Sequence, residues 1–252
     1  MMNFKNTLLL GHRGAHGEAL ENTLAGFKLA QNLQTAGLIG VEFDVQLSAD
    51  GHLMVFHDDN LQRLCGQQSR LDQLSLAEIQ RYSQLDYKQS GHKQPVHNIM
   101  PLADIAPVLQ GFTYIELEIK THERTNYRKL IKALMLELVN SPLARLPIVL
   151  TSFDVELHAG LQRNKLLKHM PRGLLIRTPE TLLTATNTAL QLGCVQLGIH
   201  YPLLNQAVIE HCHRYHLPVS AWTVNDGDTM EKLIVWQVDA IITDYPTYFL
   251  TH

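Results

Sequence analysis

The most regular alternation of hydrophobic and polar residues lies in the stretch Gly40–Leu47, whose sequence is GVEFDVQL. A period of two residues is typical of a β-strand with one apolar and one polar face. The dipeptide Asp50-Gly51 follows as a strong turn signal, and a second apolar run occupies residues 53–56. An Asp-Gly pair between two apolar runs favours a hairpin. The sequence therefore predicts two antiparallel strands joined by a tight turn.

The predicted hairpin brings two acidic residues close to a histidine. Glu42 and Asp44 are two residues apart and share the polar face of the first strand. If Asp50 and Gly51 are the two central residues of the turn, Asp44 lies opposite His57 on the second arm. Directly opposed residues have Cβ atoms about 4.5–5.5 Å apart. We therefore expect Asp44 and His57 to be cross-strand neighbours, within one residue of register.

Short apolar runs typical of buried strands recur along the chain, and helical patterns separate most of them. Eight such α/β units favour a TIM (β/α)8 barrel with the hairpin at its second strand. A doubly wound sheet is the main alternative, but no G-x-G-x-x-G motif follows the first strand. The candidate parallel strands are the runs at Leu8 and Val41, followed by residues 114–119, 148–152, 173–176, 195–198, 219–224 and 240–243.

The segment between the hairpin and the third parallel strand, about residues 59–113, lacks this regular alternation. We expect it to be a small insertion over the barrel mouth, with a short helix at residues 101–109 that returns to the core. No repeat or low-complexity tract competes with this interpretation. Residues 1–252 are therefore predicted to form a single domain.

Composition narrows the possible partners. The chain has 252 residues, 45% of them hydrophobic, and a net charge of -3, so no basic surface favours nucleic acid or an anionic membrane. The three cysteines are widely spaced and form no C-x-x-C pattern. The apolar run before Gly11 is too short for a signal or membrane helix. We expect a cytoplasmic protein that acts on a small molecule, without membrane insertion. The sequence does not indicate an oligomeric state.

In a TIM barrel the active site is built at the carboxyl ends of the strands. Here those ends combine three carboxylates, two histidines and two cations. The residues are Glu42, Asp44, Glu118, His12, His57, Arg13 and Lys120.

The three carboxylates suggest a metal site. Without a nearby thiol, they suit one hard divalent cation such as Mg²⁺ or Ca²⁺. The alternative is a metal-free ion network with Arg13 and Lys120, but burying five charges costs several kcal/mol per ion unless each is satisfied. With a divalent ion, the three carboxylates and two cations leave one net positive charge. A singly charged phosphodiester would neutralise it.

Two histidines beside such a site suggest a general acid and a general base, because imidazole titrates near neutral pH. Of the 14 histidines, His12 and His57 stand out because each ends a predicted strand. Cys194 and Ser152 are weaker candidates as nucleophiles, since neither has a base and an orienting group at a recognisable spacing.

Several stretches together resemble the glycerophosphodiester phosphodiesterases. They are HRGAHGEALENTLAGF, VEFDVQLSADGHLMVFHDD, LEIK, WTVND and VDAIITDYP, in this order along nearly the whole chain. The resemblance implies a barrel that hydrolyses glycerophosphodiesters, such as glycerophosphocholine and glycerophosphoethanolamine, with the help of a divalent metal. The products would be sn-glycerol 3-phosphate and an alcohol. The attacking group would be water, or the substrate's own glycerol hydroxyl in a reaction that passes through a cyclic phosphate.

The resemblance also implies roles for individual residues. Three carboxylates would bind the metal, two histidines would act as the acid-base pair, two cations would bind phosphate, and a tryptophan would line the glycerol pocket. In that order these residues are Glu42, Asp44 and Glu118; His12 and His57; Arg13 and Lys120; and Trp222.

Two other functions stay open at this point. One is a related phospholipase, of the phosphatidylinositol-specific phospholipase C or sphingomyelinase D type. The other is a barrel that binds a phosphorylated ligand without turnover.

This chain departs from the resembled family near the predicted site. Leu20 replaces a common Pro, residues 60–66 replace a Thr- and Gly-rich segment, and Glu116 stands where an Asn is common. Glu116 shares a face with Glu118 but lies one layer deeper in the barrel. A buried carboxyl without a partner has a raised pKa. We therefore expect Glu116 to have a hydrogen-bond partner or a proton.

Overall fold

The computed structural model describes residues 4, 6–84 and 97–251. Eight parallel strands form a closed barrel, because β1 pairs with both β12 and β2. The predicted TIM barrel is therefore confirmed. The barrel strands are β1 (Leu8–His12), β2 (Gly40–Leu47), β7 (Tyr114–Ile119), β8 (Ile148–Ser152), β9 (Arg172–Ile176), β10 (Gln196–His200), β11 (Val219–Trp222) and β12 (Ala240–Thr243).

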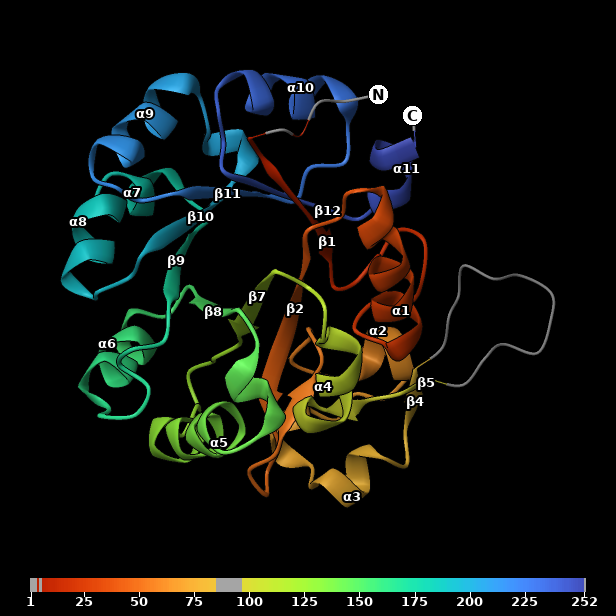
Figure 1. Cartoon of the computed structure of the whole chain (residues 1–252). Coiled ribbons are helices and arrows are strands. Elements are labelled where there is room, and N and C mark those ends of the chain that lie inside the picture. The colour runs from red at the N-terminus through yellow and green to blue at the C-terminus, as the bar shows by residue number, and fades with distance from the viewer. Residues whose placement is uncertain (1–3, 5, 85–96, 252) are drawn as a thin grey trace.

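Helices surround the barrel (Figure 1). Several begin at a polar residue whose side chain accepts a hydrogen bond from the first turn, as Asp154 and Asp226 do. The helices are α1 (Leu24–Asn32), α4 (Leu102–Leu109), α5 (Tyr127–Val139), α6 (Val155–Arg163), α7 (Pro179–Leu182), α8 (Ala185–Gln191), α9 (Gln206–Arg214), α10 (Gly227–Val235) and α11 (Pro246–Thr251), with 3-10 turns η1 (Leu33–Ala36), η3 (Pro142–Arg145) and η4 (Tyr201–Leu203).

The alternating residues of β2 point to opposite sides of the barrel wall, the apolar ones outward and the polar ones inward. Val41, Phe43 and Val45 belong to the main hydrophobic core, and the Phe43 ring meets that of Phe27 from α1 with centroids 5.3 Å apart. The alternate residues of the strand have the opposite orientation. The acidic side chains of β2 therefore face the barrel interior.

The hairpin has a different register from the predicted one. Val45 pairs with Val55 in β3 (Leu53–Val55), which places Asp44 opposite Phe56, one residue before His57. The difference arises from the loop, which is closed by a hydrogen bond from Ser48 to His52 and therefore has three central residues instead of two. The third is Gly51 with a φ of 96°, as in a type I turn followed by a bulge. The expectation of neighbours within one residue of register is confirmed.

The insertion packs against the hairpin with a small core of its own. Met54 and Phe56 from the hairpin contact insertion residues such as Leu61 and Ile79 in this core. The predicted helix at residues 101–109 is confirmed as α4, whereas residues 85–96 of the predicted insertion lie outside the described part of the chain. The other insertion elements are α2 (Gln62–Cys65), η2 (Leu71–Gln73), α3 (Leu76–Ile79), β4 (Ser83–Gln84), β5 (His97–Asn98) and β6 (Met100–Pro101).

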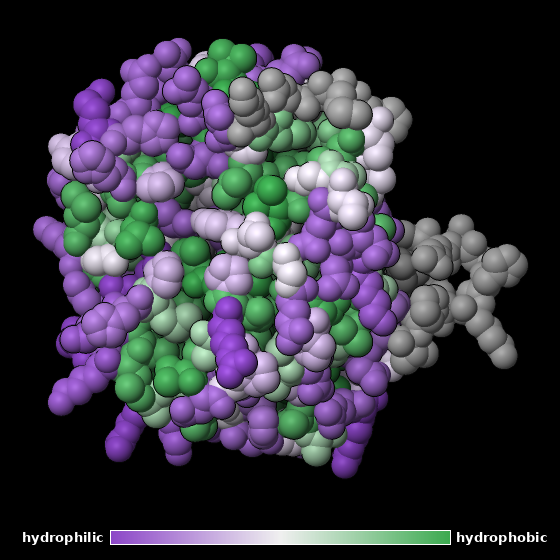
Figure 2. Space-filling model, viewed as in Figure 1, coloured by the Kyte–Doolittle hydropathy of each residue, from purple (hydrophilic) through white to green (hydrophobic). Residues whose placement is uncertain are grey.

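Hydrophilic side chains dominate the periphery of the face shown in Figure 2, with hydrophobic ones in scattered patches. Among the described residues, no helix combines the length and the apolar character that crossing a membrane requires.

The close approach of β2 and β7 leaves no space for a side chain at Gly40. A Cβ atom there would overlap with the carbonyl oxygen of Tyr114 on the adjacent strand. We expect Gly40→Ala to lower the free energy of unfolding by about 3 kcal/mol, since backbone must move to relieve the overlap. Urea unfolding measures this change. As a control, Gly66→Ala should cost about 1 kcal/mol, because only its φ of 70° opposes the new side chain. Equal effects of the two substitutions would contradict this prediction.

Candidate active site

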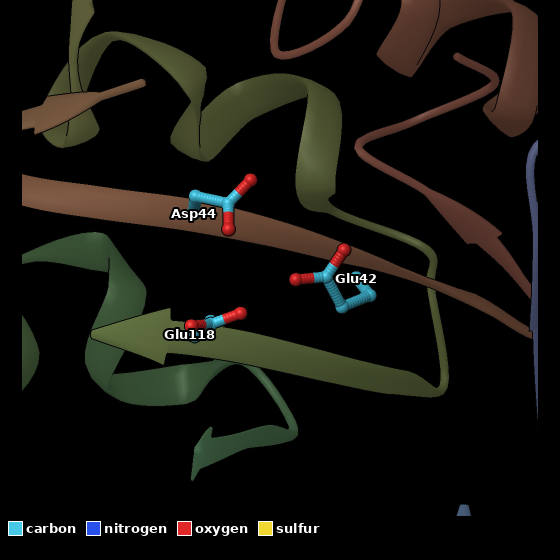
Figure 3. A group of neighbouring side chains, drawn as sticks. All are labelled: Glu42, Asp44 and Glu118. Carbon is cyan, nitrogen blue, oxygen red and sulfur yellow. The ribbon is translucent and has the colours of Figure 1, made fainter. Parts of the chain in front are cut away.

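The three predicted carboxylates converge at the carboxyl end of two adjacent parallel strands (Figure 3). Glu42 and Asp44 lie on β2, and Glu118 on β7 is the register partner of Asp44. One oxygen from each carboxylate lies within 4.8 Å of the other two. Glu42 and Asp44 are buried, and Glu118 is half-buried. The three oxygens are close enough to share one divalent cation.

Two cations pack against these carboxylates. The Lys120 Nζ lies 3.0 Å from Asp44 Oδ1 and 2.7 Å from Glu118 Oε1. The Arg13 Nε lies 3.2 Å from Asp44 Oδ2. Among the described residues, Glu42 accepts only a long hydrogen bond of 3.4 Å, from the backbone N–H of Arg13. The cations therefore compensate Asp44 and Glu118 much better than Glu42.

The pKa values of the two buried carboxyls shift in opposite directions for this reason. Burial would raise the pKa of Asp44, but the charges of Lys120 and Arg13 outweigh it and hold that pKa well below its usual range. Burial, and then the charges of Asp44 and Glu118, raise the pKa of Glu42 well above its usual range. The cluster lacks positive charge at Glu42.

His12 reaches this cluster from the end of β1. Its Nδ1 lies 2.5 Å from Asp244 Oδ1, and its Nε2 lies 3.7 Å from Glu42 Oε2. Asp244 directly follows β12 and also accepts a hydrogen bond of 2.7 Å from Asn225. This anchored carboxylate favours a proton on Nδ1 and leaves Nε2 directed at the carboxylate cluster.

His57 has the same kind of partner. Its Nδ1 lies 2.8 Å from Asp58 Oδ1, and Asp58 also accepts hydrogen bonds of 2.7 and 2.9 Å from Arg63. Burial would raise the pKa of Asp58, but the bonds from His57 and Arg63 lower it. The Gln46 side chain donates to the carbonyls of Phe56 and Asp58, on either side of His57. Both the ring and its backbone are therefore fixed.

Arg63 connects the two sides of the site. This α2 side chain also donates two hydrogen bonds, of 2.6 and 2.8 Å, to Glu21, which is only 1% exposed. Glu21 in turn accepts a hydrogen bond of 2.7 Å from Arg13. Burial would raise the pKa of Glu21, but the bonds and charges of Arg63 and Arg13 lower it to about 2. The guanidinium of Arg63, which comes from the insertion, thus binds both Glu21, the partner of Arg13, and Asp58, the partner of His57.

Trp222 lies at the end of β11 and meets the Phe153 ring with centroids 5.6 Å apart. Both rings line a small cavity of about 30 Å³, together with His12, Glu42 and Glu118. The predicted glycerol-pocket residue therefore lies beside the carboxylate cluster.

Glu116 lines the same cavity and is completely buried. It accepts hydrogen bonds of 3.0 Å from Gln196 and 3.3 Å from Ser220. Burial is the main cause that raises its pKa to about 7, against the effect of these bonds. The expectation of a hydrogen-bond partner for Glu116 is confirmed.

All eight predicted site residues lie at one mouth of the barrel. Sequence reasoning had assigned no role to the residues that orient them. The order His57-Asp58 and the position of Asp244 after the last strand were the available signals for the two histidine partners. No local pattern marked Arg63, because its contacts depend on how the insertion folds back. These orienting residues are Glu21, Asp58, Arg63, Asp244 and Asn22, whose side chain donates a hydrogen bond of 3.0 Å to Asp44.

Comparison with known proteins identifies the family. The sequence model of the Glycerophosphoryl diester phosphodiesterase family matches residues 12–248. The chain belongs to this family.

Individual relatives agree with this assignment. A Caldanaerobacter subterraneus subsp. tengcongensis protein named glycerophosphodiester phosphodiesterase is 30% identical over 246 residues, which cover 95% of each chain. An Oleispira antarctica phosphodiesterase, solved in complex with the product sn-glycerol-3-phosphate, is 27% identical with a TM-score of 0.84, covering 96% of this chain and 94% of that one. A Thermotoga maritima glycerophosphodiester phosphodiesterase shares the fold, at 24% identity, a TM-score of 0.75 and 97% coverage of each chain.

The link through Arg63 can be tested by stability measurements. We expect Arg63→Met to lower the free energy of unfolding at pH 7 by about 1–2 kcal/mol, a value reduced for the 45% exposure of Arg63. The pKa of Glu21 is depressed from 4.5 to about 2, so its contribution is complete above about pH 4.5 and is lost as the pH falls toward 2. The difference between variant and wild type should therefore shrink over this range.

Chemical unfolding at a series of pH values measures that difference. The matched control is Arg163→Met, which removes an exposed arginine of α6 and should leave stability within about 0.5 kcal/mol. If the free energy of unfolding of Arg63→Met stays below that of the wild type by the same amount from pH 7 to pH 2, the prediction is contradicted. The ionised carboxylates of Glu21 and Asp58 would then not be the groups through which Arg63 stabilises the fold.

Proposed function

We propose that this protein hydrolyses glycerophosphodiesters in a metal-dependent reaction that releases sn-glycerol 3-phosphate and an alcohol. The observation that carries the proposal is the convergence of three carboxylates, two cations and two aspartate-anchored histidines at one barrel mouth. Family membership supports the reaction class, and the product in the Oleispira antarctica structure supports the glycerol phosphate half of the substrate.

Glu42, Asp44 and Glu118 fit a divalent cation by donor chemistry and by charge. Their oxygens suit Mg²⁺ or Ca²⁺, and no Lys or Arg among the described residues forms an ion pair with Glu42. A bound divalent ion would polarise a phosphoryl oxygen and stabilise the charge that develops there. With this ion the cluster carries one net positive charge, which suits a phosphodiester.

Arg13 and Lys120 are the proposed phosphate ligands. Each already lies within 3.2 Å of Asp44, so the carboxylate cluster holds both cations in place before substrate binds. Cations fixed in this way need little reorganisation as charge develops on the phosphoryl oxygens. Trp222 is the proposed wall of the glycerol pocket.

His12 and His57 are the proposed acid-base pair. Asp244 and Asp58 accept from the Nδ1 atoms, so each Nε2 can take or give a proton. One imidazole removes a proton from the attacking water or glycerol hydroxyl, and the other protonates the alkoxide that leaves as its P–O bond breaks. Attack by the glycerol hydroxyl would give a cyclic phosphate, which water then opens to sn-glycerol 3-phosphate. The single-domain organisation and cytoplasmic location expected from the sequence stay predictions.

The proposed metal site predicts that the activity requires a divalent ion. Release of glycerol 3-phosphate from glycerophosphoethanolamine should cease after treatment with EDTA and return when Mg²⁺ or Ca²⁺ is added in excess. An enzyme-coupled glycerol 3-phosphate assay gives the rates. Full activity in EDTA would contradict the metal proposal. Absence of turnover with every glycerophosphodiester and metal tested would contradict the proposed function.

The two histidines should be necessary for the chemical step. We expect His12→Ala and His57→Ala each to lower kcat by about 10²–10⁴, because each removes a group that transfers a proton. Circular dichroism should show that both variants stay folded. The control is His169→Ala, which alters an exposed histidine after α6 and should retain wild-type kcat. Retention of full activity by either site variant would disprove the acid-base assignment.

A further inference from the structure

Two cavities of different size meet at the carboxylate cluster. The small one, of about 30 Å³, is lined by His12 and Trp222, and the larger one, of about 440 Å³, by His57 and Arg177. Both are lined by Glu118 and Phe153. The two proposed acid-base residues therefore border different cavities on either side of the cluster.

This arrangement matches the shape of a phosphodiester, whose two arms diverge from one phosphorus atom. If the phosphate binds at the cluster, one arm extends into each cavity. The constant glycerol arm would lie on the side of Trp222, the proposed wall of its pocket. The larger cavity can accommodate leaving alcohols of different size and charge.

Arg177 is the cation of the larger cavity that, among the described residues, has no carboxylate partner. It directly follows β9, and its Cζ lies 4.5 Å from the ring centroid of Phe153 and 5.3 Å from that of Trp222. Within residues 4, 6–84 and 97–251, no carboxylate lies within 4.0 Å of its guanidinium, and no hydrogen bond joins it to another residue. Lys120, which lines the same cavity, instead lies between two carboxylates.

The contact with the two rings positions the Arg177 guanidinium so that it can bind an anion. A guanidinium supported by aromatic faces keeps N–H groups available, and these match a carboxylate or phosphate in a bidentate geometry. The same contact gives Phe153 and Trp222 a cation already, so they offer less to a quaternary ammonium group.

We infer that the larger cavity binds the leaving alcohol and that Arg177 favours alcohols bearing an anionic group. This inference rests on the proposed function and adds a substrate class to it. Serine is such an alcohol. Its carboxylate suits Arg177, and its ammonium group suits the exposed Asp59, which also lines this cavity.

Glycerophosphoserine and glycerophosphoethanolamine provide the test, because their alcohols differ by one carboxylate. The measured quantity is the ratio of kcat/KM for the serine diester to kcat/KM for the ethanolamine diester. We expect this ratio to be about 10 or more in the wild type, since a charge-assisted bidentate contact discriminates by at least this factor. Arg177→Met should bring the ratio close to one, and Arg177→Lys should give an intermediate value.

The control is Arg163→Met, which removes a cation outside both cavities and should keep the wild-type ratio. A wild-type ratio of one or less overturns the inference even if the Arg177 variants are inactive. An unchanged ratio in Arg177→Met also overturns it. In both cases turnover of glycerophosphoethanolamine leaves the proposed function intact. Lack of turnover of both diesters with either metal would instead remove the proposed function and this inference with it.

Discussion

The site depends on the burial of three carboxylates at one barrel mouth with two cations as compensation. Mutual repulsion and desolvation both oppose this arrangement. Lys120 and Arg13 offset the charges of Asp44 and Glu118, but Glu42 is left with a long hydrogen bond from a backbone N–H. A divalent cation would offset the remaining negative charge at Glu42. The proposed catalytic metal would therefore lie where the cluster is short of positive charge.

The fold supports this cluster with rigid elements. Adjacent parallel strands fix the carboxylates, while Asp244 and Asp58 orient the histidines. The insertion contributes Arg63, whose bonds to Glu21 and Asp58 join the Arg13 side of the mouth to the His57 side. A segment outside the regular barrel is therefore part of what positions the proposed acid-base pair.

Eight apolar runs separated mostly by helical patterns predicted the barrel, and the carboxyl ends of its strands predicted the cluster. Period-two alternation predicted which strand residues face inward, as with Glu42 and Asp44. The register of the hairpin was wrong by one residue, since the Asp50-Gly51 signal does not distinguish a two-residue from a three-residue loop. Arg63 and Arg177 could not be assigned. Their roles depend on the path of the insertion and on side-chain contacts between distant strands, neither of which leaves a local pattern.

The most direct test of the central claim is calorimetric titration of the metal-free protein with Mg²⁺ and with Ca²⁺. A site built from the three carboxylates predicts one bound ion per chain for at least one of these metals. Binding should be lost in folded Glu42→Gln and retained in Glu231→Gln, which alters an exposed glutamate on α10. Absence of binding by the wild type, or undiminished binding by Glu42→Gln, would contradict a metal site at this cluster.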